Sequence, residues 1–164
     1  MTLTIVPAIG ELLEPWRTVH NIVISPVQLT TEEVAQRALR NDLTVAFHDG
    51  VLVGNATVRA PQEGAVTVIV RVLPERRRYG HGSEYLHEVL KRPRAREAEQ
   101  INTVVLAASV DGGLAFAHRH GFVETERYEV DGVAFIDLTL QRATASVPSG
   151  SHHRIDREGC PGAD

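Results

Sequence analysis

The most informative part of this chain is Val66–Ser83, which reads VTVIVRVLPERRRYGHGS. Its first half is rich in β-branched residues and ends at a proline, a pattern typical of a buried strand. Its second half passes three arginines and reaches Gly80-His81-Gly82-Ser83, where we expect a helix to begin. A strand, a glycine turn and a helix N-terminus bring backbone N–H groups and a positive dipole end together. The stretch therefore predicts a site for a phosphate or pyrophosphate group.

The rest of the sequence predicts one domain in which helices cover a largely antiparallel sheet. The Asp-Gly pairs at 49–50 and 131–132 are strong hairpin signals. Thr30 and Glu33 have the spacing of a capping box at a helix start. We expect strands at 3–6, 43–47, 51–58, 66–73, 101–108, 122–130 and 133–140. We expect helices near 15–23, 30–39 and 82–90, and a short one from 111 to 121. The predicted fold class is therefore α+β, a mixed α/β layer.

Length and composition limit the possible functions. A chain of 164 residues is long enough for one core, and we assign 1–142 to the domain and 143–164 to a disordered C-terminal tail. The formal net charge of −4 gives no global basic field for nucleic acid. Cys160 is the only cysteine, so neither an internal disulfide nor a cysteine-based metal site is expected. With no apolar stretch of membrane-spanning length and no signal-peptide pattern, we expect a cytoplasmic protein without a membrane partner.

The glycine turn carries a family resemblance. Residues 77–82 read Arg-Arg-Tyr-Gly-His-Gly and match the pattern R/Q-x-x-G-x-G/A after a strand that ends in Val-Leu-Pro. This motif resembles the acetyl-CoA-binding signature of the GCN5-related N-acetyltransferase (GNAT) superfamily. Ser109–Phe122 is similar to the second recurring region of that family, a strand and a short helix followed by Gly-Phe. The order of the expected elements from about residue 3 to residue 140 is also that of the family, which implies a twisted central sheet flanked by about four helices.

Two other phosphate-binding motifs do not fit the same residues. A Rossmann fingerprint would need a third glycine where Tyr85 stands, and a Walker loop would need a Gly-Lys-Ser/Thr triplet, which is absent from the sequence.

The resemblance implies acetyl-CoA as a co-substrate. Backbone groups at the strand end, Val72 and Leu73, would bind the pantetheine arm as an added strand does. The N–H groups from Arg78 through Ser83 would surround the pyrophosphate, and Phe116 would pack against the pantetheine or the thioester. The implied cofactor-binding residues are Val72, Leu73, Arg77, Arg78, Tyr79, Gly80, His81, Gly82, Ser83, Ser109 and Phe116.

Two positions depart from the family pattern. Many members place an asparagine at the strand end and a tyrosine four residues before the Gly-Phe glycine, where this chain has Ser109 and Ala117. Ala117 cannot protonate a departing CoA thiolate, so Tyr128 is a candidate donor, with simple burial in the sheet as the alternative. His20 is the candidate base acting through a water, with Glu33 as a second choice. The alternative for His20 is an ordinary surface histidine.

Two classes of function stay open. The first is an N-acetyltransferase that moves an acetyl group from acetyl-CoA to a primary amine by direct attack. A small-molecule amine is the preferred acceptor, because no acidic run would recruit a basic peptide, and a protein lysine or N-terminus is the other choice. The second is a CoA-binding sensor or interaction domain with weak or no catalysis. Homodimers are common in the family, but no interface is indicated by the residues.

Overall fold

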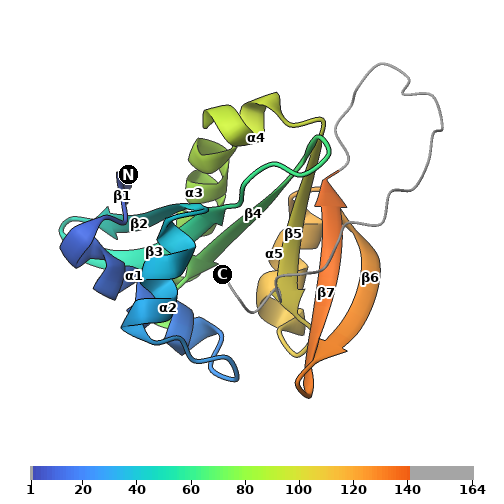
Figure 1. The fold of residues 1–164 in the computed structure, drawn as a ribbon, viewed down its shortest axis with the longest axis horizontal. Helices are drawn as coiled ribbons and strands as arrows, with labels where there is room; N and C mark the ends of the chain where they lie inside the picture. Colours follow the sequence, from blue (N-terminus) through green and yellow to red (C-terminus); the bar gives the residue numbers. More distant parts are fainter. Residues whose placement is uncertain (1, 141–164) are drawn as a thin grey trace.

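The computed structural model describes residues 2–140, and the tail predicted for 143–164 lies outside the described residues. These residues form a seven-stranded sheet with helices on both faces (Figure 1). The strands are β1 (Thr4–Pro7), β2 (Asp42–His48), β3 (Val51–Val58), β4 (Ala65–Val72), β5 (Gln100–Leu106), β6 (Phe122–Val130) and β7 (Val133–Leu140). The helices are α1 (Leu13–Val23), α2 (Thr31–Ala38), α3 (His81–Leu90), α4 (Pro93–Glu97) and α5 (Ala115–Arg119).

The sheet confirms the predicted fold class. Its strand order is β1-β2-β3-β4-β5-β7-β6, and every neighbouring pair is antiparallel except β4 and β5. The described residues hold five α-helices rather than about four. The additional helix is α4, because Pro93 starts a new turn at N1 instead of only ending the preceding helix.

Local signals in the sequence explain several of the element boundaries. Thr30 and Glu33 form the expected capping box, each side chain bonding the backbone N–H of the other residue. Asp49 and Gly50 both have positive φ, as do Asp131 and Gly132. This is the backbone that a two-residue hairpin turn requires, so both hairpins form where the Asp-Gly pairs stand.

The two faces of the sheet bury different cores. On one face, α3 packs over β3 and β4 through Tyr85, Leu86 and Val89. On the other face, α1 and α2 cover β2, β3 and β4, and Trp16 is fully buried there. The Trp16 Nε1 donates a hydrogen bond of 3.2 Å to the carbonyl of Ala56 on β3, which fixes α1 against the sheet.

The parallel pair β4 and β5 separates soon after it begins. Its register runs only from Ala65 opposite Gln100 to Thr67 opposite Asn102. At this closed end the carbonyl of Gly64 accepts hydrogen bonds from the N–H groups of Glu99 and Gln100. Beyond it the two strands diverge, because β5 continues along β7 while β4 continues along β3 (Figure 1). The sheet is therefore open in its middle, and α3 begins just beyond the open end of β4.

Candidate functional site

The opening between β4 and β5 exposes a strand edge. In an antiparallel pair, alternate residues direct their backbone groups to the partner strand. Leu73 donates to the carbonyl of Val53, and Thr67 accepts from the N–H of Arg59, so the odd-numbered residues of β4 face β3. The even-numbered residues Val70 and Val72 consequently direct their N–H and C=O groups toward β5, which has already turned away. This edge can pair with an extended ligand as if with a strand.

The backbone contact predicted for Leu73 is wrong. Its N–H donates to the carbonyl of Val53 at 2.9 Å, and its carbonyl accepts from the N–H of Arg76 at 2.9 Å. Both backbone groups are therefore used within the chain. The sequence could not show which residues of β4 bond to β3, since this depends on the register between the two strands. In the structure Val70, rather than Leu73, joins Val72 in directing its backbone groups toward the opening.

The loop between β4 and α3 has the backbone of an anion-binding turn. Arg78 has a φ of 70° and Gly80 a φ of 80°. Alternation of right- and left-handed backbone turns successive N–H groups toward one point, and a helix start leaves its first N–H groups without intrahelical partners. Arg77, Arg78, Tyr79 and Gly80 are all exposed, so this point is open to a ligand. The glycine is required at 80 by its φ rather than by space, because nothing lies within 4 Å of an added Cβ.

The second glycine is required for a different reason. A Cβ on Gly82 would lie 3.1 Å from Phe116 Cε2 and 3.6 Å from Val72 Cγ2. The start of α3, the ring of Phe116 on α5 and the end of β4 therefore meet at this glycine. The structure thus brings Phe116 to the open end of the strand edge, where the resemblance places it.

Two predicted ligand-binding side chains make contacts within the chain. The Nε of Arg77 donates a hydrogen bond of 3.0 Å to the carbonyl of Val72. Its Nη1 lies 3.6 Å from the position of a Cβ on Gly112, in the π-helical turn Val110–Leu114. Arg77 thus crosses the open end between β4 and that turn, and a ligand pairing with Val72 must displace it. The Ser83 hydroxyl lies 2.9 Å from the Nε2 of His120.

The side chain of His81 is buried. It is 6% exposed, and its ring lies 5.0 Å from that of His48 and 5.9 Å from that of Tyr79. Burial, reinforced by the neighbouring His48, lowers its pKa from the usual value. The lowered pKa disfavours the charged imidazolium, so the backbone N–H of His81 is the better candidate to serve an anion.

In the second family region, Ser109 and Ala117 both have structural roles. Ser109 caps the π-helical turn by accepting a hydrogen bond of 3.0 Å from the N–H of Gly113. Ala117 is buried on α5. Ala117 has no proton to supply, and the Ser109 oxygen is used as a cap.

His20 is not a surface residue, so that alternative is wrong. Its side chain is 0% exposed and stacks on Trp16 at a centroid distance of 5.7 Å. Its Nε2 lies 2.9 Å from the carbonyl of Val27, which can only accept, so this nitrogen carries the proton. Burial, followed by the charge of Arg71, lowers its pKa to about 3. His20 is therefore a neutral hydrogen-bonding group and a weak proton acceptor at pH 7. Its spacing of four from Trp16 places it on the buried face of α1, a signal present in the sequence.

Tyr128 bonds a carboxylate that sequence reasoning missed. Its hydroxyl donates a hydrogen bond of 2.8 Å to Oδ1 of Asp137 on β7. Burial raises the pKa of Asp137, while Tyr128 and the charge of Arg59 act in the opposite direction. Asp137 pairs with Val104 of β5, and Asn102 pairs with Thr67 of β4, so Asp137 lies on the face covered by α1 and α2. Glu33, the second candidate base, is used in the capping box of α2.

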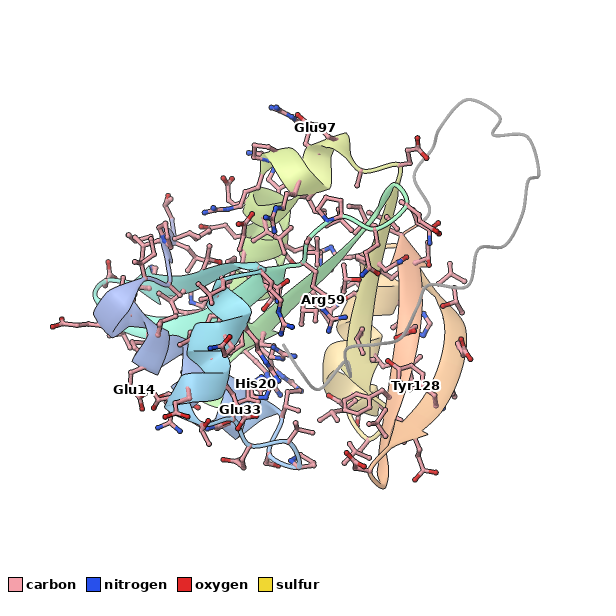
Figure 2. The ribbon with its side chains drawn as sticks, viewed as in Figure 1. Glu14, His20, Glu33, Arg59, Glu97 and Tyr128 are labelled. Atoms are coloured by element: carbon pink, nitrogen blue, oxygen red, sulfur yellow. The ribbon has the colours of Figure 1, made fainter. Side chains whose placement is uncertain are left out.

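The two candidate catalytic residues lie on different parts of this face. Figure 2 shows His20 on α1 next to α2, Tyr128 on the β6–β7 side, and Arg59 between them in this view. The charge of Arg59 acts on both Arg71 and Asp137, which agrees with this intermediate position. The structure therefore does not bring His20 and Tyr128 together as an acid–base pair.

The described residues show neither a metal cluster nor a membrane-spanning helix. Within residues 2–140, no group of three or more His, Cys, Asp or Glu side chains is arranged to hold a metal ion. No helix in that range has the length and apolar character needed to cross a bilayer. A surface hollow of about 740 Å³ lies between the start of the chain and α3, and Gly80, Gly82 and Val72 are not among its lining residues. It is lined by Thr2, Leu3, Ile5, Glu84, Glu88, Lys91, Arg92 and Pro93.

Comparison with known protein families identifies the domain. The family model described as an acetyltransferase (GNAT) domain matches residues 16–142, which is most of the chain. The chain belongs to the GNAT acetyltransferase family. The resemblance predicted from the sequence is thereby confirmed for this GNAT domain. No curated protein matches the sequence.

Solved structures share the fold of this GNAT protein. A protein provisionally named a phosphinothricin N-acetyltransferase has a TM-score of 0.73 and 19% identity, covering 87% of this chain and 100% of its own. The ribosomal-protein-S18-alanine N-acetyltransferase of Escherichia coli has a TM-score of 0.70 and 16% identity, covering 88% and 97%. A GNAT acetyltransferase of Elizabethkingia anophelis with acetyl-CoA bound has a TM-score of 0.62 and 15% identity, covering 85% and 98%. At these identities the likeness is one of fold.

Proposed function

We propose that this GNAT protein is an N-acetyltransferase that uses acetyl-CoA as co-substrate and acetylates a primary amine by direct attack. The observation that carries the proposal is the opening between β4 and β5. It offers the backbone of Val70 and Val72 to an extended arm, and the turn at Arg78–Gly80 lies at its end. A solved neighbour of the same fold contains acetyl-CoA. The residues present fit this co-substrate, provided that Arg77 leaves the carbonyl of Val72.

The proposed chemistry needs few special groups. The acceptor nitrogen attacks the thioester carbonyl carbon, a C–N bond forms, and the C–S bond breaks to release the thiolate of CoA. Backbone N–H groups at the Val72 end of β4 would stabilise the oxyanion of the tetrahedral intermediate. Thiols have pKa values near 8.5, so the thiolate leaves readily although Ala117 offers no proton. Most of the rate would come from alignment of the two substrates.

The acceptor side supplies a better base than His20. A general base works best with a pKa near the working pH, and burial moves the pKa of Asp137 upward while that of His20 falls to about 3. We therefore propose that Asp137 accepts the proton of the acceptor's ammonium group, directly or through a water, so that the neutral amine can attack. Tyr128 holds the carboxylate by its hydrogen bond, a positioning role, instead of serving as the acid for the thiolate.

A small-molecule amine is the proposed acceptor. The names of the structural neighbours include enzymes for a small molecule and for a ribosomal protein, so the fold admits both acceptor classes. The sequence holds no acidic run that would recruit a basic peptide, which favours the small molecule.

A second function, a CoA-binding domain without turnover, is favoured by one observation. The positions where many relatives hold a catalytic tyrosine and an asparagine are a buried alanine and a serine that caps a turn. Calorimetry with CoA and acetyl-CoA tests the shared ligand, and thiol release with a panel of amines separates the two functions. Tight CoA binding with thiol release supports the enzyme, whereas binding without release from any amine supports the binding domain.

The direct-attack step has its own test. Mass spectrometry of the protein after mixing with acetyl-CoA alone should show the unmodified mass. A stable acetyl adduct on the protein would contradict direct transfer and indicate an acyl-enzyme intermediate.

A further inference from the structure

The face of the sheet under α1 carries a buried arginine that no described carboxylate neutralises. Arg71 lies near the end of β4 and is only 7% exposed. Its Nη1 is buried and makes no hydrogen bond. Burial, followed by the charges of Arg59 and Arg37, lowers its pKa to about 9, and none of the groups acting on it is acidic. A buried cation in this condition is costly, so its presence requires an explanation.

Unpartnered acceptors lie on the same face of the sheet as this cation. Asn55 stands opposite Arg71 in the β3–β4 register, and Thr57 follows on the same face two residues later. The Oδ1 of Asn55, the Oγ1 of Thr57 and the Nδ1 of His20 are all buried without a hydrogen-bond partner. The Nδ2 of Asn55 donates a hydrogen bond to the carbonyl of Trp16, and the Nε2 of His20 donates one to the carbonyl of Val27. Buried polar atoms are normally paired, so four unpartnered atoms on one face, with Asn55 opposite Arg71 and His20 under the influence of its charge, indicate a missing ligand.

The missing ligand can be described from its partners. The Arg71 guanidinium offers N–H donors and a positive charge, which suit a planar or tetrahedral oxyanion. The amide oxygen of Asn55 and the unprotonated Nδ1 of His20 are acceptors, which suit N–H groups. A small molecule that carries both an anion and an amine satisfies both sets. A neutral alkylamine would leave Arg71 unpaired.

The position of these residues agrees with an acceptor site. Arg71 directly precedes Val72, whose backbone groups face the opening, and successive side chains of a strand lie on opposite faces. The Arg71 side chain is therefore on the α1 face within one residue of the edge proposed for the pantetheine arm. Arg37 of α2 and Arg59 add positive charge from the same side.

We infer that the acceptor of this enzyme is an amine bearing a compact anionic group, a carboxylate or a phosphorus oxyanion, that pairs with Arg71 under α1. This inference rests on the proposed acetyl transfer and names the acceptor class. The amine of the same molecule then lies toward Asn55 and His20 before it reaches the thioester. An amino acid or an aminophosphonate has this chemistry.

The experiment compares matched acceptors in the full-length protein. Thiol release from acetyl-CoA is measured with α-amino acids and their carboxamides, and with β-alanine, β-alaninamide and 2-aminoethylphosphonate. Arg71→Met removes the buried cation and keeps an unbranched apolar side chain about as long as the aliphatic part of arginine, and Arg96→Met removes an exposed cation on α4 as a matched control. Comparing the acid-to-amide ratio of kcat/KM between proteins cancels the difference in nucleophilicity between an amino acid and its amide. The phosphonate arm distinguishes the two classes of anion.

We expect the acid-to-amide ratio to fall roughly ten- to a hundredfold in Arg71→Met and to stay unchanged in Arg96→Met. Arg71→Met should also raise the thermal midpoint, because it removes an unpaired buried charge, and it should keep its affinity for CoA. Two results would overturn the inference while acetyl transfer itself stands. One is a wild-type protein whose kcat/KM is no higher for the acids than for their amides, and the other is an Arg71→Met variant that keeps the wild-type acid-to-amide ratio.

A binding measurement separates the inference from the proposed function. The thermal midpoint is measured with the best acid and its amide in the absence of acetyl-CoA. If no amine releases thiol but the acid stabilises the wild type and not Arg71→Met, the anion site stands and the acetyltransferase does not. If the acid neither stabilises the wild type nor reacts faster than its amide, the anion site is refuted.

Discussion

The Oγ of Ser83 and the Nε2 of His120 lie 2.9 Å apart and join the first turn of α3 to the end of α5. The ring of His120 also lies 4.5 Å from that of Phe116, which packs against Gly82. The glycine loop is therefore held from α5 by one polar and one aromatic contact. Burial, with the nearby Arg119, lowers the pKa of His120, which favours the neutral ring in this contact.

Loss of this contact should weaken the binding of CoA. We expect His120→Ala to lower CoA affinity about three- to tenfold, the usual effect of one hydrogen bond. Ser83→Ala should have a similar effect, and the double variant should lose little more than either single one, because the two side chains act as a pair. His118→Ala, an exposed histidine on the same helix, is the control. Additive losses in calorimetry would show that Ser83 and His120 act separately.

Gly82 should not tolerate a larger side chain. In Gly82→Val the Cβ meets Phe116 at 3.1 Å and the added methyl groups extend into the end of the opening. We expect CoA binding to fall at least tenfold, because the ring of Phe116 and the end of β4 must separate. Adding Phe116→Ala should restore part of the affinity by making room. Circular dichroism controls for folding, and an unchanged affinity in folded Gly82→Val would contradict the site.

His20 should make the protein sensitive to acid. Its pKa is lowered from 6.5 to about 3 on folding, so the unfolded chain binds a proton over this range that the folded chain does not. The free energy of unfolding therefore falls as the pH drops through 6.5 toward 3. Between pH 7 and pH 5 this group alone should remove about 2 kcal/mol.

The comparison that isolates His20 uses His20→Gln. Glutamine can still donate to the carbonyl of Val27 but does not titrate. Urea unfolding at pH 7 and pH 5 should show a drop in the wild type that is about 2 kcal/mol larger than in the variant. Equal drops would mean that His20 is accessible to protons in the folded protein.

The pair of Tyr128 and Asp137 should set the acidic limb of the activity profile. The hydroxyl of Tyr128 stabilises the ionised carboxylate, so Tyr128→Phe should move the pKa of Asp137 further upward. If Asp137 is the base, the acidic limb of kcat/KM moves to higher pH in Tyr128→Phe. Asp137→Asn should lower kcat/KM by roughly a hundredfold or more and abolish that limb. A limb that stays in place in both variants would assign the base elsewhere.

Much of the fold follows from local signals. The Asp-Gly turns, the capping box of α2 and the apolar strand before the glycine loop each depend on a few adjacent residues, and the structure confirms them. The separation of β4 from β5 could not be predicted in this way. It depends on which partner each strand follows beyond Thr67, a matter of long-range register.

The candidate site was only partly predictable for the same reason. The loop residues were found because glycine and arginine spacing is visible in one segment. Arg71 and Asp137 could not be assigned to the site from the sequence. Each stands in an apolar strand, and strand pairing decides which face of the sheet its side chain occupies and which helix covers that face. A charged residue inside such a strand was nevertheless a usable signal, since burial of a charge requires a reason.

The short register between β4 and β5 has a mechanical consequence. The sheet has two portions, β1–β4 and β5–β7. Among the described residues, three β4–β5 residue pairs and the contacts at Gly64 join their strands. A ligand bound between β4 and β5 would contact both portions at the open end, where the two strands do not pair. Ligand occupancy would then determine how rigidly the two parts move as one body, and slower amide exchange on both β4 and β5 would report it.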